Sequence, residues 1–536
     1  MPMMPTTQLL VILVAVLAAV AILASRLRVP TAVLLVLTGV GLALIPGLPT
    51  IELAPEVVLL LVLPPVIYNA AVAMDWREFR DNLRPISSLA VGSVLFTTIA
   101  TAAATHLLLG MPWPVGFVLG AIVSPPDTMA PGSIAHRMRI PRRILVILEG
   151  EGLANDATAL ILYRFAVAAV SVGAFSLTDA VGTFAVIVGG EILWGIGVGW
   201  VMLRLRRWVN EPRIEITLAV LTPFLAYWPP EHLGGSGVLA TVTTGLYTSW
   251  AGPGLISAAT RLQGIFFWDL FIYLIEGLVF LVTGLQARLL ISRIDPHHLS
   301  ALALSALVVS AVVIVARFLW NAPAAYLPRR FNFWIRHDEP MPPWQWVFTV
   351  GFTGIRGIVS LAAALALPLQ TANGALFPQR DLILILTFVV ILVTLVGQGL
   401  LLPSVIQLLG LADAGRREHE RVRAQEYAAR KRAIEAALHR FDSLSRHHHL
   451  SREWVAGMRS HHEDRLRQAR HSSDGDQRHR RTSAVHDEIE QALIDAERQE
   501  VNDLFRQGQL NDEARRHIER ELDLREAQLR NSRSEG

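Results

Sequence analysis

Residues 120–133 read GAIVSPPDTMAPGS, an apolar stretch that contains three prolines and one acidic residue. Pro125, Pro126 and Pro131 each lack a backbone N–H donor, so an α-helix cannot pass through the stretch unbroken. Irregular backbone at membrane depth is tolerated only where protein or a water-filled cavity covers it. The stretch therefore predicts a membrane helix that is broken around Asp127.

The whole chain has the composition of an all-α polytopic membrane protein. It has 536 residues, of which 52% are hydrophobic, and about thirteen segments are long and apolar enough to cross a bilayer at roughly 20 residues each. They are residues 8–25, 29–46, 55–74, 84–110, 114–135, 144–171, 178–205, 213–230, 235–255, 264–290, 299–327, 344–370 and 380–409. The first span lacks the basic segment of a cleaved signal peptide, so we expect it to remain in the protein.

A second interrupted span contains VGFTGIRGIVSL, residues 350–361, where three glycines surround Arg356. If the span at 178–205 is a linker helix, six spans precede it, six follow it, and each broken span is the fifth of its set. Interrupted segments at corresponding places in two halves indicate the substrate site of an inverted-repeat transporter. The competing interpretation is two unrelated kinks, because Gly and Pro are common in membrane helices.

Arginine is concentrated in alternate loops. The basic loops are residues 25–28, 76–84, 136–143, 204–213, 260–263, 328–337 and 415–421, and the exceptions on the other side are Arg288, Arg293 and Arg380. The positive-inside rule places the basic loops in the cytoplasm. We therefore expect a multi-pass protein of the cell membrane with its N terminus outside and its C-terminal tail inside.

Charged side chains inside the spans each need a partner or a function, because a charge at the bilayer centre costs roughly 2.5–3.5 kcal/mol on insertion scales. They are Asp127, Glu149, Glu151, Asp156, Arg164, Glu191, Glu276, Arg317 and Arg356.

Asp156 lies in ILEGEGLANDATALILYRF, residues 147–165. On a helix it shares one stripe with Glu149, Gly152 and Asn155. Burial without a fixed counter-charge raises the pKa of a carboxyl group towards neutrality, so that the group holds either a proton or a dehydrated monovalent cation. Such competition at one site is sufficient for one-for-one exchange.

The neighbouring acidic residues have different expected roles. Glu149 lies near the membrane edge and is expected to form a solvated ion pair with the basic loop at 136–143. Glu151 is four residues before Asn155, so it can join a hydrogen-bond network with that amide. Arg356 is the arginine that we expect to neutralise Glu151.

EGEGLANDATALILYRF, residues 149–165, resembles the ExxxND signature of electroneutral sodium/proton antiporters in the monovalent cation/proton antiporter superfamily. The resemblance covers residues 8–410 and continues in LPPVIYNAA (63–71), GAIVSPPDTMAP (120–131), GLVFLVTGLQ (277–286) and FTGIRGIVSLAAALALP (352–368). It implies exchange of Na⁺ or Li⁺ for H⁺ without a cofactor. It also implies a homodimer in the lipid bilayer, two crossed broken helices and an elevator-like alternation of access.

The resemblance also assigns site residues. It makes Asp156 the cation and proton carboxylate and Asp127 the acid of the unwound helix beside it. Asn155, Glu151 and Arg356 would form the supporting polar network. An Asn rather than a second Asp at position 155 is similar to the electroneutral branch of the superfamily.

Two positions depart from the family pattern. The family usually has Ser where this chain has Gly152, and often has Thr where this chain has Pro126, and both hydroxyls are expected cation ligands. Backbone carbonyls at these two positions, water, or the hydroxyls of Ser124 and Thr128 are the alternatives. The choice among Na⁺, Li⁺ and K⁺ therefore stays open, because these ions differ in the oxygens and the dehydration that they need.

Several other classes of protein are excluded or disfavoured. Cysteine is absent, and Lys431 in the tail is the only lysine, so a retinal Schiff base and a Walker A nucleotide site are excluded. A gated cation channel using the same acids would need a continuous pore. A GxSG string around Ser236 is similar to intramembrane serine proteases, but the histidines that follow it before the tail, His297, His298 and His337, lie in expected loops.

The chain changes character at about Asp413, which divides an exchanger domain at 1–412 from a charged tail at 413–536. Balanced charge and apolar residues at helical spacing predict cytosolic helices and argue against nucleic-acid binding. The tail is rich in histidine, including His447, His448, His449, His461 and His462. A regulatory role, pH sensing or metal binding by these residues is the alternative to a solvated helical face.

Overall fold

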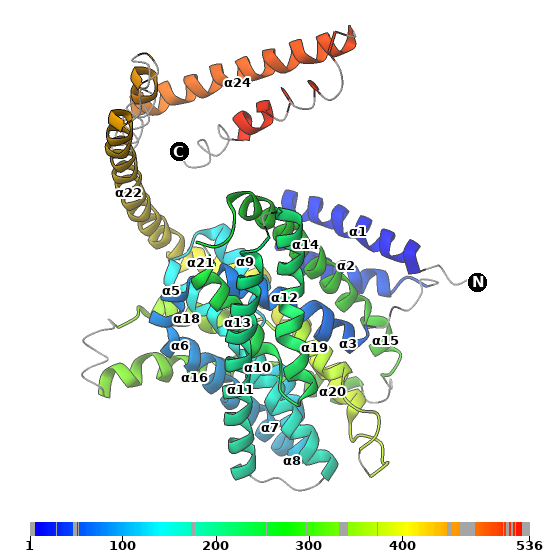
Figure 1. The fold of residues 1–536 in the computed structure, drawn as a ribbon. Helices are drawn as coiled ribbons and strands as arrows, with labels where there is room; N and C mark the ends of the chain where they lie inside the picture. The colour runs from blue at the N-terminus through cyan, green and yellow to red at the C-terminus, as the bar shows by residue number, and fades with distance from the viewer. Residues whose placement is uncertain are drawn as a thin grey trace. The chain divides into compact units, whose positions relative to one another are not determined.

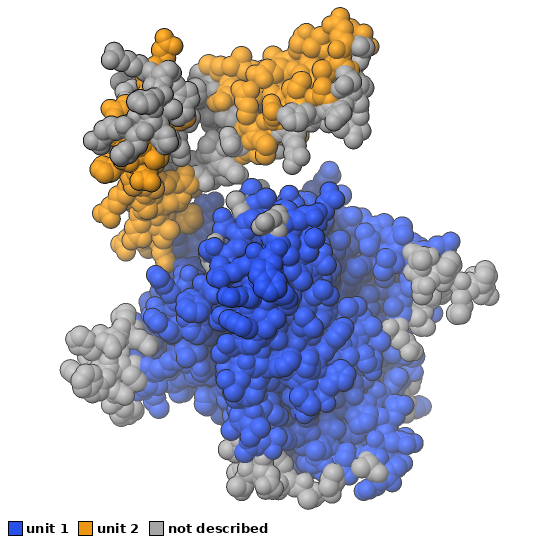
Figure 2. Space-filling model, in the orientation of Figure 1, with its two compact units in different colours: residues 1–416 blue, residues 417–536 orange. Residues whose placement is uncertain are grey.

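The computed structural model describes residues 6–27, 29–46, 51, 53–172, 177–209, 211–252, 254–294, 297, 299–331, 341–371, 373–447, 453, 455–460, 477–507, 509–510, 514–515, 518–519 and 521–527. The chain divides into two compact units, residues 1–416 and 417–536, which Figure 2 shows in different colours. Each unit is described by itself.

The first unit is built from helices (Figure 1). They are α1 (Thr6–Leu27), α2 (Thr31–Ala43), α3 (Pro55–Val57), α4 (Leu63–Ala73), α5 (Trp76–Asp81), α6 (Leu83–Ser87), α7 (Val94–Leu109), α8 (Trp113–Val123), α9 (Met129–Met138), α10 (Arg142–Val172), α11 (Leu177–Arg206), α12 (Pro212–His232), α13 (Val238–Ala251), α14 (Ala258–Leu285), α15 (Ala287–Ile291), α16 (Leu299–Phe331), α18 (Trp344–Phe352), α19 (Ile358–Leu365), α20 (Arg380–Leu392) and α21 (Gly399–Leu408). The π-helical turns η1 (Val58–Val62), η2 (Ser88–Ser93) and η4 (Val393–Gln398) join α3 to α4, α6 to α7 and α20 to α21. Within the described residues the only β pairing is one isolated bridge, between Gln370 and Leu376.

The helices confirm the expected class, an all-helical polytopic membrane protein. Among the described residues, 8 helices are long and apolar enough to cross a membrane, and α2 and α8 are shorter apolar helices. Each of the expected spans contains helical residues. The count of thirteen crossings and the repeat relationship between the halves remain predictions.

Small residues allow the closest helix contacts. A Cβ atom at Gly39 of α2 would overlap the Leu281 carbonyl of α14, and a Cβ at Gly284 would overlap the Val36 carbonyl of α2. Association of helices in a membrane depends on such close packing, because lipid supplies no hydrophobic drive between them. These two glycines therefore fix the contact between α2 and α14.

The largest apolar core packs against one half of each broken segment. Side chains of α8 and α19 pack with those of α16 and α20, and Leu119, Leu361, Val313 and Leu386 are fully buried examples. Close packing of this kind holds short helices that would not be stable alone. This core thus positions α8 and α19, while side chains of α9 and α18 pack in a second cluster with α10 and α21.

The second unit contains most of α22 (Leu411–His447) and α24 (Gln477–Arg506). Arg498 of α24 donates to Asp523 at 2.9 Å and to Glu526 at 2.8 Å, and Ile494 is buried with Leu522. His448, His449, His461 and His462 lie outside the described residues, and so does the side chain of His447.

Candidate ion-binding site

The two broken segments meet at their breaks. α8 ends at Val123 and α9 begins at Met129, while α18 ends at Phe352 and α19 begins at Ile358. The backbone N–H of Asp127 in the first break donates to the carbonyl of Ile355 in the second, with an N···O distance of 2.7 Å. A Cβ atom at Gly357 would overlap the Asp127 carboxylate, so this close approach requires glycine.

Arg356 binds the C-terminal end of α8 and the backbone of the second break. Its Nε donates to the Val123 carbonyl at 2.8 Å and its Nη2 to the Ser124 carbonyl at 3.3 Å, and Nη1 contacts the Gly354 carbonyl. The Val123 and Ser124 carbonyls lie at the end of α8, where carbonyls lack intrahelical partners, and the Gly354 carbonyl lies in the non-helical second break. A buried guanidinium, 1% exposed, therefore satisfies them and offsets the partial negative charge at the end of α8.

Glu151 is bound by Arg317. The expectation from the sequence that Arg356 neutralises Glu151 is wrong. Arg317 of α16 donates to the two Glu151 oxygens at 2.6 and 2.8 Å, and its Nε and Nη2 donate to the Val350 carbonyl of α18 at 3.1 and 3.0 Å. A bidentate pair with these further bonds is the geometry that a buried ion pair needs. Sequence analysis identified Arg317 only as a buried charge in need of a partner, and that need was the available signal.

Asn155 connects α10 to the first break. Its Nδ2 donates to the Pro126 carbonyl at 2.7 Å, and the residue is fully buried. This bond holds α10, and with it the adjacent Asp156, against the crossing. Arg356, Glu151 and Asn155 are thus all brought to the breaks, although each contacts a different group.

Acceptor oxygens without donors collect at the crossing. Asp127 Oδ1 accepts from the Met129 N–H at 2.9 Å, whereas Asp127 Oδ2 and Asn155 Oδ1 are buried and have no hydrogen-bond partner among the described residues. Asp156 is half-buried, and within the same part of the chain it makes neither a hydrogen bond nor an ion pair. Oxygen acceptors with no donor to satisfy them are what a hard cation or a bound proton requires.

The two departures from the family pattern have a geometric counterpart. A Cβ atom at Gly152 would overlap the hydroxyl and methyl of Thr128, so the Thr128 side chain occupies the space that a serine at 152 would fill. The Pro126 carbonyl accepts from Asn155. Ser124 is buried, and its hydroxyl donates to the Ala121 carbonyl at 3.2 Å.

Other charged groups have structural partners away from the crossing. Glu149 lies 2.7 Å from Nε2 of His136, which confirms the expected pairing with the basic loop. Arg164 forms an ion pair with Glu231. These two acids are therefore separate from the candidate site.

The GxSG string has a structural role. Glu191 of α11 accepts from the backbone N–H groups of Ser236 at 2.6 Å and Leu239 at 3.1 Å, at the start of α13. The Ser236 hydroxyl lies 3.3 Å from both Glu191 oxygens, and no histidine contacts it within the described residues. A carboxylate at a helix N terminus is stabilising, which explains the buried Glu191 without any catalysis.

Two broken apolar segments that meet at their breaks, with carboxylates at the crossing, are typical of ion-transporting membrane proteins. A family model described as the transmembrane part of sodium/hydrogen exchangers matches residues 12–408. The chain therefore belongs to the sodium/hydrogen exchanger family. Members of this family are transporters rather than enzymes, their substrates are cations, and they need no cofactor.

Relatives support this assignment along most of the chain. The chain is 35% identical over 531 residues to an uncharacterized Na⁺/H⁺ exchanger of Mycobacterium tuberculosis, which covers 97% of this chain and 96% of the relative. It is 30% identical over 386 residues to a sodium, potassium, lithium and rubidium/H⁺ antiporter of Bacillus pumilus, covering 70% of this chain and 57% of the relative. The fold is similar to the sodium proton antiporter of Methanocaldococcus jannaschii, with a TM-score of 0.61, 19% identity, and coverage of 75% of this chain and 98% of that one.

Proposed function

We propose that the protein is a secondary active antiporter that exchanges Na⁺ or Li⁺ for H⁺ one for one. The observation that supports this most directly is the group of acceptor oxygens at the crossing, on Asp127 and Asn155, that have no donor among the described residues. A proton or a cation can satisfy such oxygens, and a permanent ion pair would prevent both. The two arginines nearby are instead held by helix-end carbonyls and by Glu151.

Asp156 is the proposed carrier of both ions. It has no ion-pair partner in the described part of the chain, so either a proton or a cation must offset its charge when it is buried. Because one site holds one or the other, the apparent KM for Na⁺ should rise as the pH falls, since protons then compete more strongly. Asp127 would complete the site from the first break.

The remaining ligands follow from the occupied space. The Thr128 hydroxyl lies where a serine at 152 would project, so we propose that it replaces that oxygen. Further proposed oxygen ligands of the cation are the carbonyls of Pro126 and Gly152 and the hydroxyl of Ser124. Transport would proceed by an elevator-like movement of the crossed helices, with Asn155, Glu151 and Arg356 holding the site together.

The proposed architecture has thirteen crossings in two inverted repeats of six, joined by α11. In this arrangement α8 with α9 and α18 with α19 are the corresponding broken helices. From the arginine-rich loops we propose that the N terminus lies outside and the tail from Asp413 in the cytoplasm, and we propose a homodimer in the cell membrane. The tail would then be available for a regulatory role at the cytoplasmic face.

K⁺/H⁺ exchange is the second candidate. It is favoured by the name of the Bacillus pumilus relative, which includes potassium and rubidium beside sodium and lithium. The absence of a serine hydroxyl at Gly152 also affects the preference between Na⁺ and K⁺, because a site with a different set of oxygen ligands need not favour the smaller ion, Na⁺.

Proteoliposomes with an imposed pH gradient test the proposal. Added Na⁺ or Li⁺ should dissipate the gradient in the natural protein, and Asp156→Asn should abolish this response. Glu149→Gln is the matched control, because it removes a carboxyl from the same helix at a residue paired with His136. Undiminished exchange in Asp156→Asn would overturn the mechanism, and a current without proton movement would indicate a channel. Repeating the assay with K⁺ decides the cation.

A further inference from the structure

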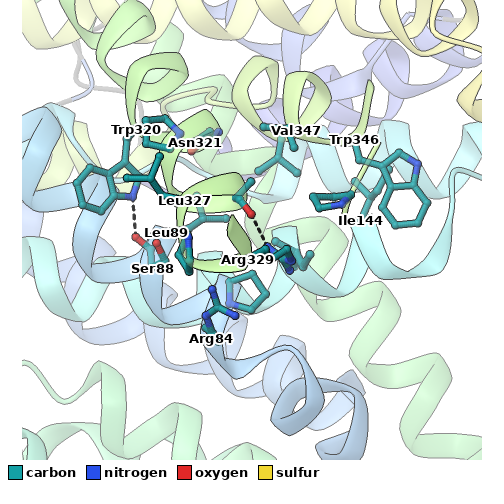
Figure 3. A pocket seen from close by; sticks show the side chains of 18 of the residues that line it. Arg84, Ser88, Leu89, Ile144, Trp320, Asn321, Leu327, Arg329, Trp346 and Val347 are labelled. Atoms are coloured by element: carbon teal, nitrogen blue, oxygen red, sulfur yellow. Dashed lines mark hydrogen bonds between the residues drawn. The ribbon is translucent and has the colours of Figure 1, made fainter. Parts of the chain in front are cut away.

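A pocket separate from the ion crossing opens beside the second broken helix. Its volume is about 490 Å³, and it is lined by residues of α6, η2, the N-terminal part of α10, the C-terminal half of α16, and α18. Figure 3 shows Trp320 and Trp346 on opposite sides of it. Pockets of roughly 300–1,000 Å³ are typical of small-molecule sites.

Most of this lining is apolar. Leu89, Ile144, Ile147, Leu327 and Val347 contribute aliphatic surface. Trp320 is fixed in place, because its Nε1 donates to the Ser88 carbonyl at 3.0 Å (Figure 3). A surface of this kind binds a hydrocarbon chain and offers little to a fully hydrated ion.

Three arginines line the same pocket. Arg84, Arg143 and Arg329 come from three different helices, α6, α10 and α16, and none of the described lining residues is acidic. Arg143 Nε donates to Asn82 Oδ1 at 3.0 Å, and Arg329 Nη1 donates to the Ala325 carbonyl at 2.6 Å, so both side chains are held in position. A guanidinium has five N–H donors in a fixed fork, which lets it keep its partners within the protein and still bind a phosphate oxygen.

We propose that this pocket binds an anionic phospholipid of the cytoplasmic leaflet. The phosphate would lie against the three arginines and one acyl chain would lie between Trp320 and Trp346. Basic pockets between membrane helices on the cytoplasmic side bind acidic lipid headgroups in this way. The proposal rests on the proposed orientation only for the choice of leaflet.

The combination of charge and apolar lining selects the occupant. Inorganic phosphate would use the arginines but leave the apolar walls in contact with water, whereas a zwitterionic lipid would bring a positive group next to three positive side chains. A lipid with net negative charge satisfies both parts. Its chain would also contact Val347 and Val350 of α18, the helix whose end Arg317 binds.

Native mass spectrometry of the full-length protein in detergent provides the test. The probes are phosphatidylglycerol, phosphatidylcholine with the same acyl chains, and inorganic phosphate. Arg84→Gln with Arg143→Gln reduces the positive charge, and Ala324→Phe fills the apolar part while keeping every arginine. Arg204→Gln with Arg207→Gln is the matched control, because these two exposed arginines belong to another basic loop outside the pocket.

We expect phosphatidylglycerol to bind about tenfold or more tightly than phosphatidylcholine, and the Arg84/Arg143 double variant to lose about the same factor. Ala324→Phe should lose a similar factor, and the control pair should be unchanged. Equal loss in the control pair, equal binding of the neutral lipid, or displacement of the lipid by phosphate alone would each overturn the proposal. If the Arg84/Arg143 variant does not elute as a single species, Ala324→Phe still decides the matter, since retained binding in it contradicts an acyl-chain site.

Discussion

Replacing Arg317 with Met should destabilise the first unit more than any loss of a surface charge. Arg317 is 1% exposed and Glu151 is 0% exposed, and removing one partner of a buried pair costs about 3–5 kcal/mol. The Val350 carbonyl also loses two N–H donors, at 3.1 and 3.0 Å, but keeps the Thr353 hydroxyl at 3.0 Å, so this loss adds about 1 kcal/mol. We therefore expect a loss of about 5 kcal/mol.

Thermal unfolding of the purified protein measures this loss. For a unit of this size a loss of about 5 kcal/mol lowers Tm by about 5 °C or more, by scaling of the unfolding entropy with chain length. The matched control is Arg142→Met, because Arg142 binds Glu78 with 41% and 38% of the two side chains exposed. Breaking such a pair costs about 1 kcal/mol or less.

A double variant separates the pair from the rest of the environment. Glu151→Leu with Arg317→Met removes both charges, and an apolar replacement of a buried pair is often neutral. The double variant should therefore recover most of the stability that Arg317→Met loses. Our interpretation is refuted if the double variant unfolds at no higher a temperature than Arg317→Met, or if Arg317→Met unfolds at the same temperature as Arg142→Met.

Three further substitutions test the site and its support. Gly357→Ala should abolish exchange, because its Cβ would overlap the Asp127 carboxylate, whereas Gly41→Ala, which meets no atom within 4 Å, should retain exchange in the same proteoliposome assay. Thr128→Val keeps the shape but removes the hydroxyl, so we expect a higher KM for Na⁺ with little change in Tm; an unchanged KM would remove Thr128 from the proposed ligands. Glu191→Gln should lower Tm by about 1–2 °C, because a charged acceptor at the start of α13 is worth about 1–2 kcal/mol more than a neutral one, and a Tm equal to that of the natural protein would contradict this account.

The sequence predicts most of the fold because span length and apolar content are local properties. The places where helices break are equally local: Pro125 and Pro126 remove donors in the first break, and glycines surround Arg356 in the second. The structure has both breaks at these positions. The pairing of Glu149 with the loop at 136–143 was also predicted correctly, since a short turn joins the two segments.

The partners of buried charges could not be predicted in the same way. Arg317 and Arg356 were both candidate partners for Glu151. Arg317 lies 166 positions from Glu151 in the sequence, and over such separations spacing does not indicate which arginine contacts the carboxylate. The choice depends on which helix packs against α10, which is a tertiary property. The same holds for Thr128, whose side chain fills the space beside Gly152 only because α9 begins where it does.

The main-chain bond between Asp127 and Ile355 has a consequence for engineering. Because a peptide N–H and a peptide carbonyl form this link, ordinary mutagenesis leaves it intact, and only proline at position 127 or an ester in place of that amide deletes it. The two broken segments are thus joined by a bond that substitution of side chains leaves in place. Side chains around the crossing can therefore change, and with them the preferred cation, while the backbone bond between the two breaks is kept.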